Sequence, residues 1–423
     1  MHALIASMVF VATLTLVILR PKGVNEAYYA LGGAVVAMLA GLISWQDVVV
    51  VAGIVWNATL ALIAIMVISQ VLDEAGFFRW IALHLARMAG RSGMKLFLGL
   101  NAMAALVTIF FNNDGSILIV TPIAYELLSA LGLGSSAVLP FLFATGFMAD
   151  AASVPLAVSN LTNIVTSDLF GLSFVGYARL LMWPGLITIL AAMVVLTLQA
   201  RRKVDLILDV KDVGEPASAI RDPFVFKIGA MVMVGVIAGY MIGEVYAIPA
   251  SLIASAGGII LLAATQRHGI ISARAVVKRA PWLIVLFAMG MYLVVYALRN
   301  VGLTAWLGQL VMAALAQGEQ FGLRATGGLF AVVSSVMNNL PSVMTGDLTI
   351  TALPTAETTK RLLAAANVIG CDIGPKLTPI GSLATLLWMH ILKGKGISVG
   401  WGEYLKFGLL VTPPVLVVAL LTI

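Results

Sequence analysis

Charged residues are scarce in this sequence. Of 423 residues, only 10% are Asp, Glu, Lys or Arg, whereas soluble domains carry about 25%. Hydrophobic residues make up 61% of the chain, and the mean hydropathy is +1.05. Apolar runs recur at the length that crosses a bilayer, about 17 to 25 residues. The composition therefore excludes a soluble globular protein and predicts an all-α polytopic membrane protein.

Cysteine and histidine are also rare. The single cysteine, Cys371, excludes a disulfide framework and any metal site built from several thiols. The spacing of the histidines suggests no metal site, so we expect neither a metal nor another cofactor. The net charge of +6 does not predict a nucleic-acid partner, because the basic residues cluster between the apolar runs, where they orient a membrane protein.

One polar stretch divides the chain into two halves. Residues 201–226 form the only long polar connection, which predicts a first half of residues 1–200 and a second half of residues 227–423, each with about five transmembrane helices. The first apolar run, residues 3–19, is preceded by no basic residue and followed by no small-residue cleavage site. We therefore expect a retained span and not a signal peptide.

The two halves share an internal repeat. An offset of 226 residues, changing later to 222, places Trp, Gly, Asn-Asn and Asp on identical residues. The matched positions are Trp56 with Trp282, Gly76 with Gly302, Trp80 with Trp306, Asn112 and Asn113 with Asn338 and Asn339, Asp150 with Asp372, and Leu161 with Leu383. Because the matches keep their order along the chain, we interpret the halves as two copies of one structural unit.

Basic residues predict how each copy is oriented. Cytoplasmic loops of membrane proteins are enriched in Lys and Arg, and such clusters lie at 20–22, 79–95, 201–203 and 267–279. The loops at 44–47 and 243–248 contain none. The chain is thus predicted to start outside an inner (plasma) membrane, with the central linker in the cytoplasm. Span 48–72 then runs inward and its partner 281–298 runs outward, so the repeats are inverted, as in many secondary transporters.

Each half also contains a pair of short apolar segments joined by Asn-Asn. We interpret residues 96–131 and 325–352 as re-entrant helical hairpins whose tips reach the middle of the membrane, where irregular backbone is tolerated only against protein or a water-filled cavity. The alternative is two ordinary pairs of spans with a polar turn outside the membrane.

Four polar clusters lie inside apolar sequence, and they form two pairs, each a hairpin tip plus a broken helix. The clusters are Asn112 to Asp114; Asp150 with Ser159, Asn160, Thr162 and Asn163; Asn338 and Asn339; and Asp372 with Lys376, Thr378 and Ser382. Pro155, Pro375 and Pro379 predict the helix breaks, because proline removes a backbone donor and frees carbonyl groups. Helix ends near the midplane offer partial charges to a substrate.

Ionisable side chains at membrane depth are costly and are functional by default. We expect Asp150 and Asp372 to bind and release a coupling proton, although a carboxylate that caps or ties helices is the alternative. Lys376 lies four residues after Asp372 and can pair with it as a fixed counter-charge. Alternatively, its ammonium stands where a related carrier holds sodium. Asp114, at a hairpin tip, is a third candidate proton carrier.

Five segments carry a resemblance to a known family. They are "FFNNDGSILIVTPI", "GFMADAASVPLAVSNLTNIV", "PWLIVLFAMGMYLVVYALRNVGL", "SSVMNNLPSVM" and "NVIGCDIGPKLTPIGSLATLLW". They resemble the ArsB arsenite and antimonite efflux permeases of the ion transporter superfamily. The resemblance implies inverted repeats with hairpins and broken helices, arsenite and antimonite as substrates, and exchange against protons. It also implies a possible soluble arsenical-pump ATPase partner. This chain has no nucleotide-binding P-loop, so we expect a transporter and not an enzyme.

The implied substrate, an uncharged trihydroxide, suits weak hydrogen-bonding groups better than a trap of several thiolates. Amide and hydroxyl side chains hold such a molecule and release it again. The candidate substrate-binding residues are Asn112, Asn113, Ser159, Asn160, Asn163, Asn338, Asn339, Thr378 and Ser382. Because a neutral cargo carries no charge, coupling requires separate titrating groups, for which the candidates are Asp150, Asp372, Lys376 and Asp114.

Other functions of the same residues stay open from the sequence. A sodium-coupled dicarboxylate carrier or a sodium/proton antiporter has the same predicted fold. A dicarboxylate site requires positive partners, and Lys376 alone brings a buried positive charge. Two buried aspartates also serve intramembrane proteases, but Asp150 and Asp372 occupy equivalent places in a repeat. A passive channel is a further alternative, which uphill accumulation excludes.

Overall fold

The computed structural model describes residues 1–208 and 214–423 and is helical almost throughout. Eight helices in the described residues are long and apolar enough to cross a membrane. The first half contains α1 (His2–Leu19), α2 (Glu26–Leu39), α3 (Trp45–Glu74), α4 (Phe77–Ala89), α5 (Gly93–Phe111), α6 (Asn113–Ala130), α7 (Ser135–Ala151), α8 (Leu161–Leu169) and α9 (Phe174–Val204). An all-α polytopic protein is therefore confirmed.

The described part of the second half has ten helices against nine in the first. It contains α10 (Pro223–Val245), α11 (Ala250–His268), α12 (Ala273–Arg279), α13 (Leu283–Asn300), α14 (Leu303–Leu315), α15 (Glu319–Met337), α16 (Asn339–Thr351), α17 (Glu357–Ile373), α18 (Leu383–Gly394) and α19 (Trp401–Leu420). The numbers differ because the offset of 226 places α12 and α13 together on α3. Helices α4 and α14 both have 13 residues, α5 and α15 both have 19, and α7 and α17 both have 17. The returning arms of the hairpins differ, because α6 has 18 residues and α16 has 13.

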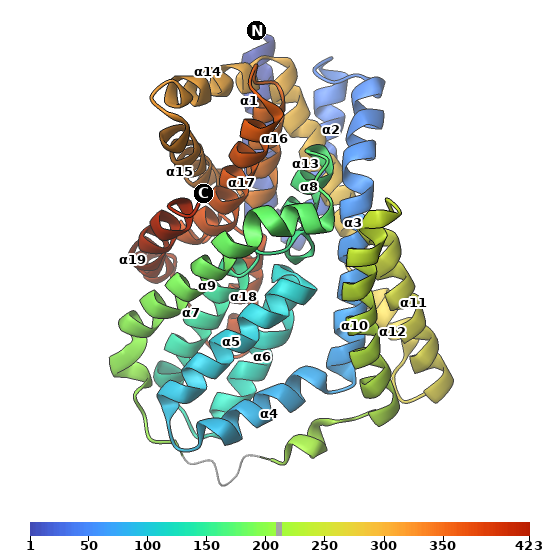
Figure 1. The fold of residues 1–423 in the computed structure, drawn as a ribbon, viewed down its shortest axis with the longest axis vertical. Helices are drawn as coiled ribbons and strands as arrows, with labels where there is room; N and C mark the ends of the chain where they lie inside the picture. The colour runs from blue at the N-terminus through green and yellow to red at the C-terminus, as the bar shows by residue number, and fades with distance from the viewer. Residues whose placement is uncertain (209–213) are drawn as a thin grey trace.

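The same backbone turns recur in both halves. Gly76 and Gly302 precede α4 and α14 with φ values of 90° and 96°, a conformation that glycine adopts without steric cost. Figure 1 shows α4 at the lower end of the molecule and α14 at the upper end, so these equivalent helices lie at opposite ends. This placement supports the inverted arrangement of the two predicted halves.

The predicted linker 201–226 is partly helical. Helix α9 continues to Val204 and α10 begins at Pro223; residues 209–213 of the predicted linker lie outside the described residues. Before these residues, Leu208 donates its backbone N–H to the carbonyl of Arg91. After them, Arg221 donates its backbone N–H to the carbonyl of Ala75. The described parts of the connection therefore run beside the ends of α4.

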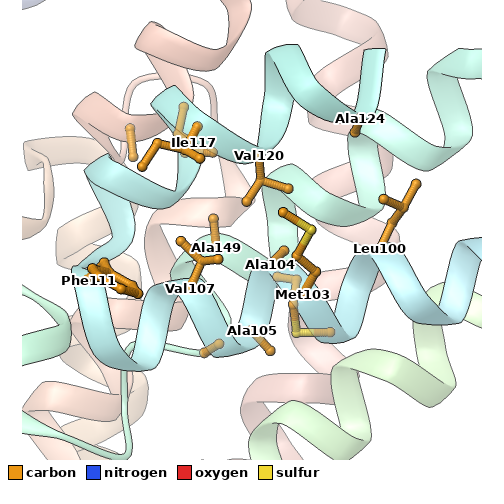
Figure 2. Packing of buried hydrophobic residues seen from close by; sticks show 14 of the residues in the cluster. Leu100, Met103, Ala104, Ala105, Val107, Phe111, Ile117, Val120, Ala124 and Ala149 are labelled. Atoms are coloured by element: carbon orange, nitrogen blue, oxygen red, sulfur yellow. The ribbon is translucent and has the colours of Figure 1, made fainter. Parts of the chain in front are cut away.

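Two groups of helices frame the site. Helices α1–α3 and α10–α13 pack mainly on one another, and we call them the flanking group. The hairpins α5–α6 and α15–α16 pack with α7, α9, α17 and α19, which we call the hairpin group. Figure 2 shows how the first hairpin is held: buried side chains such as Val107 and Val120 lie between its arms, close to Ala149 of α7.

The inverted arrangement predicts that equivalent loops face opposite sides of the membrane. Arg91 and Gln317 lie 226 positions apart, and both are exposed. We expect Arg91→Cys to react with a membrane-impermeant maleimide only from the cytoplasmic side and Gln317→Cys only from the outside. The native Cys371 is buried and provides a low background. Labelling of both from one side would contradict the inversion.

Candidate functional site

The two hairpin tips have the same unusual backbone. Asn112 and Asn338 have φ and ψ of 84° and 153°, and 76° and 153°. This region is essentially restricted to glycine, and a residue held there is strained by about 1–3 kcal/mol. The Oδ1 atom of Asn112 accepts from the N–H of Gly115, and that of Asn338 accepts from Leu340. Each asparagine thus begins the returning helix, α6 or α16.

The other ends of these two amides have no hydrogen-bond partner within residues 1–208 and 214–423. The Nδ2 atoms of Asn112 and Asn338 are buried and make no hydrogen bond to any described residue, and the same holds for Oδ1 of Asn113 and Oγ of Ser382. Buried polar groups are nearly always hydrogen-bonded, and one left alone costs about 1–3 kcal/mol. These atoms are therefore available to a guest molecule or to water.

Two broken helices meet the tips. Helix α7 ends at Ala151 and α8 begins at Leu161, while α17 ends at Ile373 and α18 begins at Leu383. The expected prolines lie in both breaks. In each break a hydroxyl donates to the hairpin of the same half: Ser159 to the carbonyl of Ile109 and Thr378 to that of Ser335. These carbonyls are 226 positions apart, so the two bonds are equivalent and hold the breaks against the hairpins.

A small cavity of about 20 Å³ lies where the breaks and tips meet. Four helices, α6, α8, α16 and α18, begin beside it, and helix N-termini carry partial positive charge. Its polar lining comprises Asp114, Asn160, Thr162, Asn339 and Ser382, and Ile284 and Phe287 of α13 in the flanking group close one side. Three predicted substrate-binding residues and one predicted proton carrier are thus brought together. The hydroxyl groups of Ser159 and Thr378 instead bind the hairpins.

Asp372 is held by neutral groups from the first half. Its Oδ1 accepts from Nδ2 of Asn160 at 2.9 Å, and its Oδ2 accepts from Oγ of Ser153 at 2.7 Å and Nδ2 of Asn163 at 3.0 Å. Its side chain is 2% exposed. Asn163 is therefore a partner of the predicted proton carrier, and one break supplies the environment of the acid in the other.

Asp150 has a cationic partner from the second half. The Nζ atom of Lys376 lies 2.8 Å from Oδ2 of Asp150, and both side chains are almost fully buried. Nδ2 of Asn113 donates to Oδ1 of Asp150 at 2.9 Å. The expected pairing of Lys376 with Asp372 is wrong, because the helix break carries Lys376 across to the first half. The lysine also donates to the carbonyl of Gly146 and to Oγ1 of Thr385, at 2.8 and 3.1 Å.

The two acids thus differ although they occupy equivalent positions. The offset of 222 places Thr385 on Asn163 and Lys376 on Val154. In the first half Asn163 reaches Asp372 directly. In the second half Lys376 lies between Asp150 and Thr385. One acid has a built-in positive charge, and the other is surrounded by hydroxyl and amide donors.

Sequence reasoning missed a buried acid in the second hairpin. Asp347 of α16 is fully buried and accepts from Oγ1 of Thr166 and from Nδ2 of Asn367. The repeat search passed over it because the offset of 226 places it on Thr121. The rule that an acid inside an apolar hairpin is functional by default would have identified Asp347. A second missed contact joins Asp168 of α8 to Asn57 of α3, at 2.8 and 3.0 Å.

Comparison with known proteins identifies close relatives. A model of the family described as "ArsB: Arsenical pump membrane protein" matches residues 5–423. An arsenical pump membrane protein of Escherichia coli (strain K12) is 44% identical over 417 residues, which cover 99% of this chain and 97% of the relative. The arsenical pump membrane protein of Yersinia enterocolitica has the same identity and coverage. A relative from Bacillus subtilis (strain 168) is 32% identical over 96% of this chain and 95% of its own length.

Solved structures support the fold alone. The YdaH transporter of Alcanivorax borkumensis superposes with a TM-score of 0.58 at 14% identity, over 87% of this chain and 86% of that one. MtrF of Neisseria gonorrhoeae superposes with a TM-score of 0.52 at 11% identity, over 87% and 81%. Both are transporters, and this chain shares their helical architecture.

The buried ion pair predicts a specific double-mutant result. Lys376→Met leaves the carboxylate of Asp150 buried without its cation, which typically costs about 3–5 kcal/mol. We expect this variant to lose its folded peak in size-exclusion chromatography after milder heating than the wild type. Adding Asp150→Asn removes the unpaired charge, and most of the loss should be recovered. Equal losses in the single and double variants would show that the pair is not the source of the effect.

Proposed function

The chain belongs to the ArsB family of arsenical pump membrane proteins, and on that basis we propose that it exports arsenite and antimonite from the cytoplasm in exchange for protons. It is a multi-pass membrane transporter and not an enzyme. The proposal concerns its cargo, the direction of transport and the coupling ion.

The cavity at the helix breaks is the observation that carries the proposal. Its polar lining consists of neutral amide and hydroxyl groups together with the carboxyl group of Asp114. An arsenic or antimony trihydroxide can donate its O–H groups to Asp114 and to amide oxygens, and it can accept from amide N–H groups. Asp114 is the one ionisable group in this lining, and the other polar groups are neutral. Such a lining can bind the cargo by hydrogen bonds without retaining it.

The size of the cavity indicates that the cargo requires movement. A volume of about 20 Å³ accommodates a water-sized molecule. Ile284 and Phe287, which close one side, belong to the flanking group. We propose that the hairpin group moves relative to α13 to admit the trihydroxide, and that this movement alternates access between the two sides of the membrane.

The arrangement of the two acids supports coupling to protons without sodium. The ammonium of Lys376 is surrounded by a carboxylate, a carbonyl and a hydroxyl oxygen, at 2.8, 2.8 and 3.1 Å. Such oxygens are the ligands that hard cations take in proteins. We propose that Lys376 occupies the place of a sodium ion and that Asp372, which has only neutral partners, binds the coupling proton.

The rival dicarboxylate carrier is disfavoured by the same contacts. A dicarboxylate requires a positive partner, but Lys376 is already paired with Asp150 and does not line the cavity. We further propose an inner-membrane location with the start of the chain outside. Association with a soluble arsenical-pump ATPase remains a proposal that rests on family membership.

Transport in everted membrane vesicles tests the proposal directly. With an imposed pH gradient, acidic inside, and no sodium, we expect wild-type protein to accumulate arsenite against its concentration gradient. Asp372→Asn removes the titrating carboxyl and should abolish accumulation, while exchange of labelled for unlabelled arsenite persists. Accumulation that required sodium, or that persisted in the variant, would overturn the sodium-free coupling or the assignment of Asp372.

The strained tips allow the side chain to be tested apart from the backbone. Asn338→Gly relieves about 1–3 kcal/mol of backbone strain, and glycine in place of an asparagine cap costs only a few tenths of a kcal/mol, so we expect thermal stability to be kept or raised. Neither Asn338 nor Asn112 lines the closed cavity, and we propose that their free Nδ2 atoms donate to the cargo once the cavity widens. Loss of that hydrogen bond should lower arsenite uptake about tenfold. Asn112→Gly is the matched variant in the other half. Normal uptake by both would exclude these amides from binding.

A further inference from the structure

Asp347 is a buried acid in the second hairpin. It lies eight residues beyond Asn339, at the start of α16, and a helix advances about 12 Å over that distance. It is therefore well separated from the cavity, toward the open end of its hairpin. Its side chain is fully buried.

The contacts of Asp347 join three helices. Oδ2 accepts from Oγ1 of Thr166, on α8, at 2.6 Å, and Oδ1 accepts from Nδ2 of Asn367, on α17, at 2.9 Å. Both partners are neutral, and among the described residues no Lys, Arg or His lies within 4.0 Å of its carboxylate. An isolated buried carboxylate is very unfavourable, so a group in this position gains by taking up a proton.

Among the residues that the structure describes, no opposite charge near Asp347 compensates for its ionised carboxylate. The titratable groups facing Asp347 from the packed helices are Tyr177 of α9, Tyr292 of α13 and Cys371 of α17, with Asp372 farther along α17. Cys371 donates to Oδ1 of Asn367. The charged residues at the open end of the hairpin are at least partly exposed: Arg299, Glu319, Arg324, Glu357, Lys360 and Arg361. Lys360 is paired there with Glu357.

Thr166 allows Asp347 to be satisfied in two protonation states. When the carboxyl is ionised, the hydroxyl of Thr166 donates to it at 2.6 Å. When the carboxyl gains a proton from water, its O–H donates to Oγ1 of Thr166, whose own hydrogen turns to the carbonyl of Thr162, 3.1 Å away. Neither state leaves a hydrogen-bonding group unpaired. The partner of Asp150 differs, because the ammonium of Lys376 donates hydrogen bonds but cannot accept one.

One face of α8 contacts both Asp347 and Asp372. Thr162 and Thr166 are one turn apart; Thr166 contacts Asp347, and Oγ1 of Thr162 lies 3.4 Å from Oδ1 of Asp372. The two carboxyls without a cation thus share a helix from the first half. We propose that Asp347 is a second proton-binding residue of the transport cycle, loaded in addition to Asp372. This inference rests on the proposed exchange of arsenite for protons.

The number of protons moved per arsenite tests the inference. Purified protein in liposomes with an internal pH-sensitive dye gives this ratio when proton movement and labelled arsenite are measured together. We expect Asp347→Asn, which keeps the shape and a hydrogen bond to Thr166, to move one proton fewer per arsenite than the wild type. Glu357→Gln, an exposed carboxyl on the adjoining helix α17, is the matched control and should keep the wild-type ratio.

The outcomes separate this inference from the proposed function. If the wild type moves no protons with arsenite, the proposed exchange itself fails. If the wild type is coupled and Asp347→Asn keeps the same ratio, Asp347 has a structural role and the inference is overturned. Should the variant not transport, infrared difference spectra of the wild type between acidic and alkaline pH supply a second measurement. A carboxyl C=O band that Asp347→Asn lacks supports the inference, and identical spectra overturn it.

Discussion

The ion pair between Asp150 and Lys376 is the interaction on which the site depends. A charge at membrane depth is stable only beside a partner, and here each half of the chain supplies one member of the pair. The pair fixes the break after α7 against the break after α17. The hydrogen-bond donors around Asp372 belong to the first half, whereas Asp372 belongs to the second. Neither half can therefore complete its own site, and the cavity exists only when both are folded together.

Backbone hydrogen bonding explains why the breaks are stable inside the protein. Irregular backbone in a membrane must find partners within the protein. Ser159 and Thr378 bind equivalent hairpin carbonyls, and the N–H of Asn339 donates to the carbonyl of Gly381. Side chains of the breaks thus satisfy carbonyls near the ends of α5 and α15, and the tip of the second hairpin satisfies one carbonyl of the second break. The same arrangement brings four helix N-termini to one cavity, which concentrates partial positive charge beside Asp114.

The sequence predicted the elements of the site better than its contacts. Hairpins predicted at 96–131 and 325–352 correspond to 93–130 and 319–351, because Asn-Asn between short apolar runs is a strong local signal. The partner of Lys376 was mispredicted, because spacing along a helix ceases to apply where the helix is broken. Asp347 was missed because the repeat places it on Thr121, and its partners, Thr166 and Asn367, come from other helices and could not be predicted from local spacing. Local sequence patterns therefore identify the helices and hairpins, whereas the partners of the buried side chains depend on contacts between the two halves.

The unequal hairpins have an electrical consequence. Helix α16 is five residues shorter than α6, a difference of about 7 Å along a helix axis. The chain therefore leaves the second tip through a shorter helix before it turns into α17. A charge that crosses the whole bilayer moves through the full membrane potential, worth about 2.3 kcal/mol per 100 mV, and the depth of the cavity sets how that energy is divided between its two sides. A cavity placed off-centre by unequal arms would divide this energy unequally, so a proton loaded from one side would sense more of the potential than one loaded from the other.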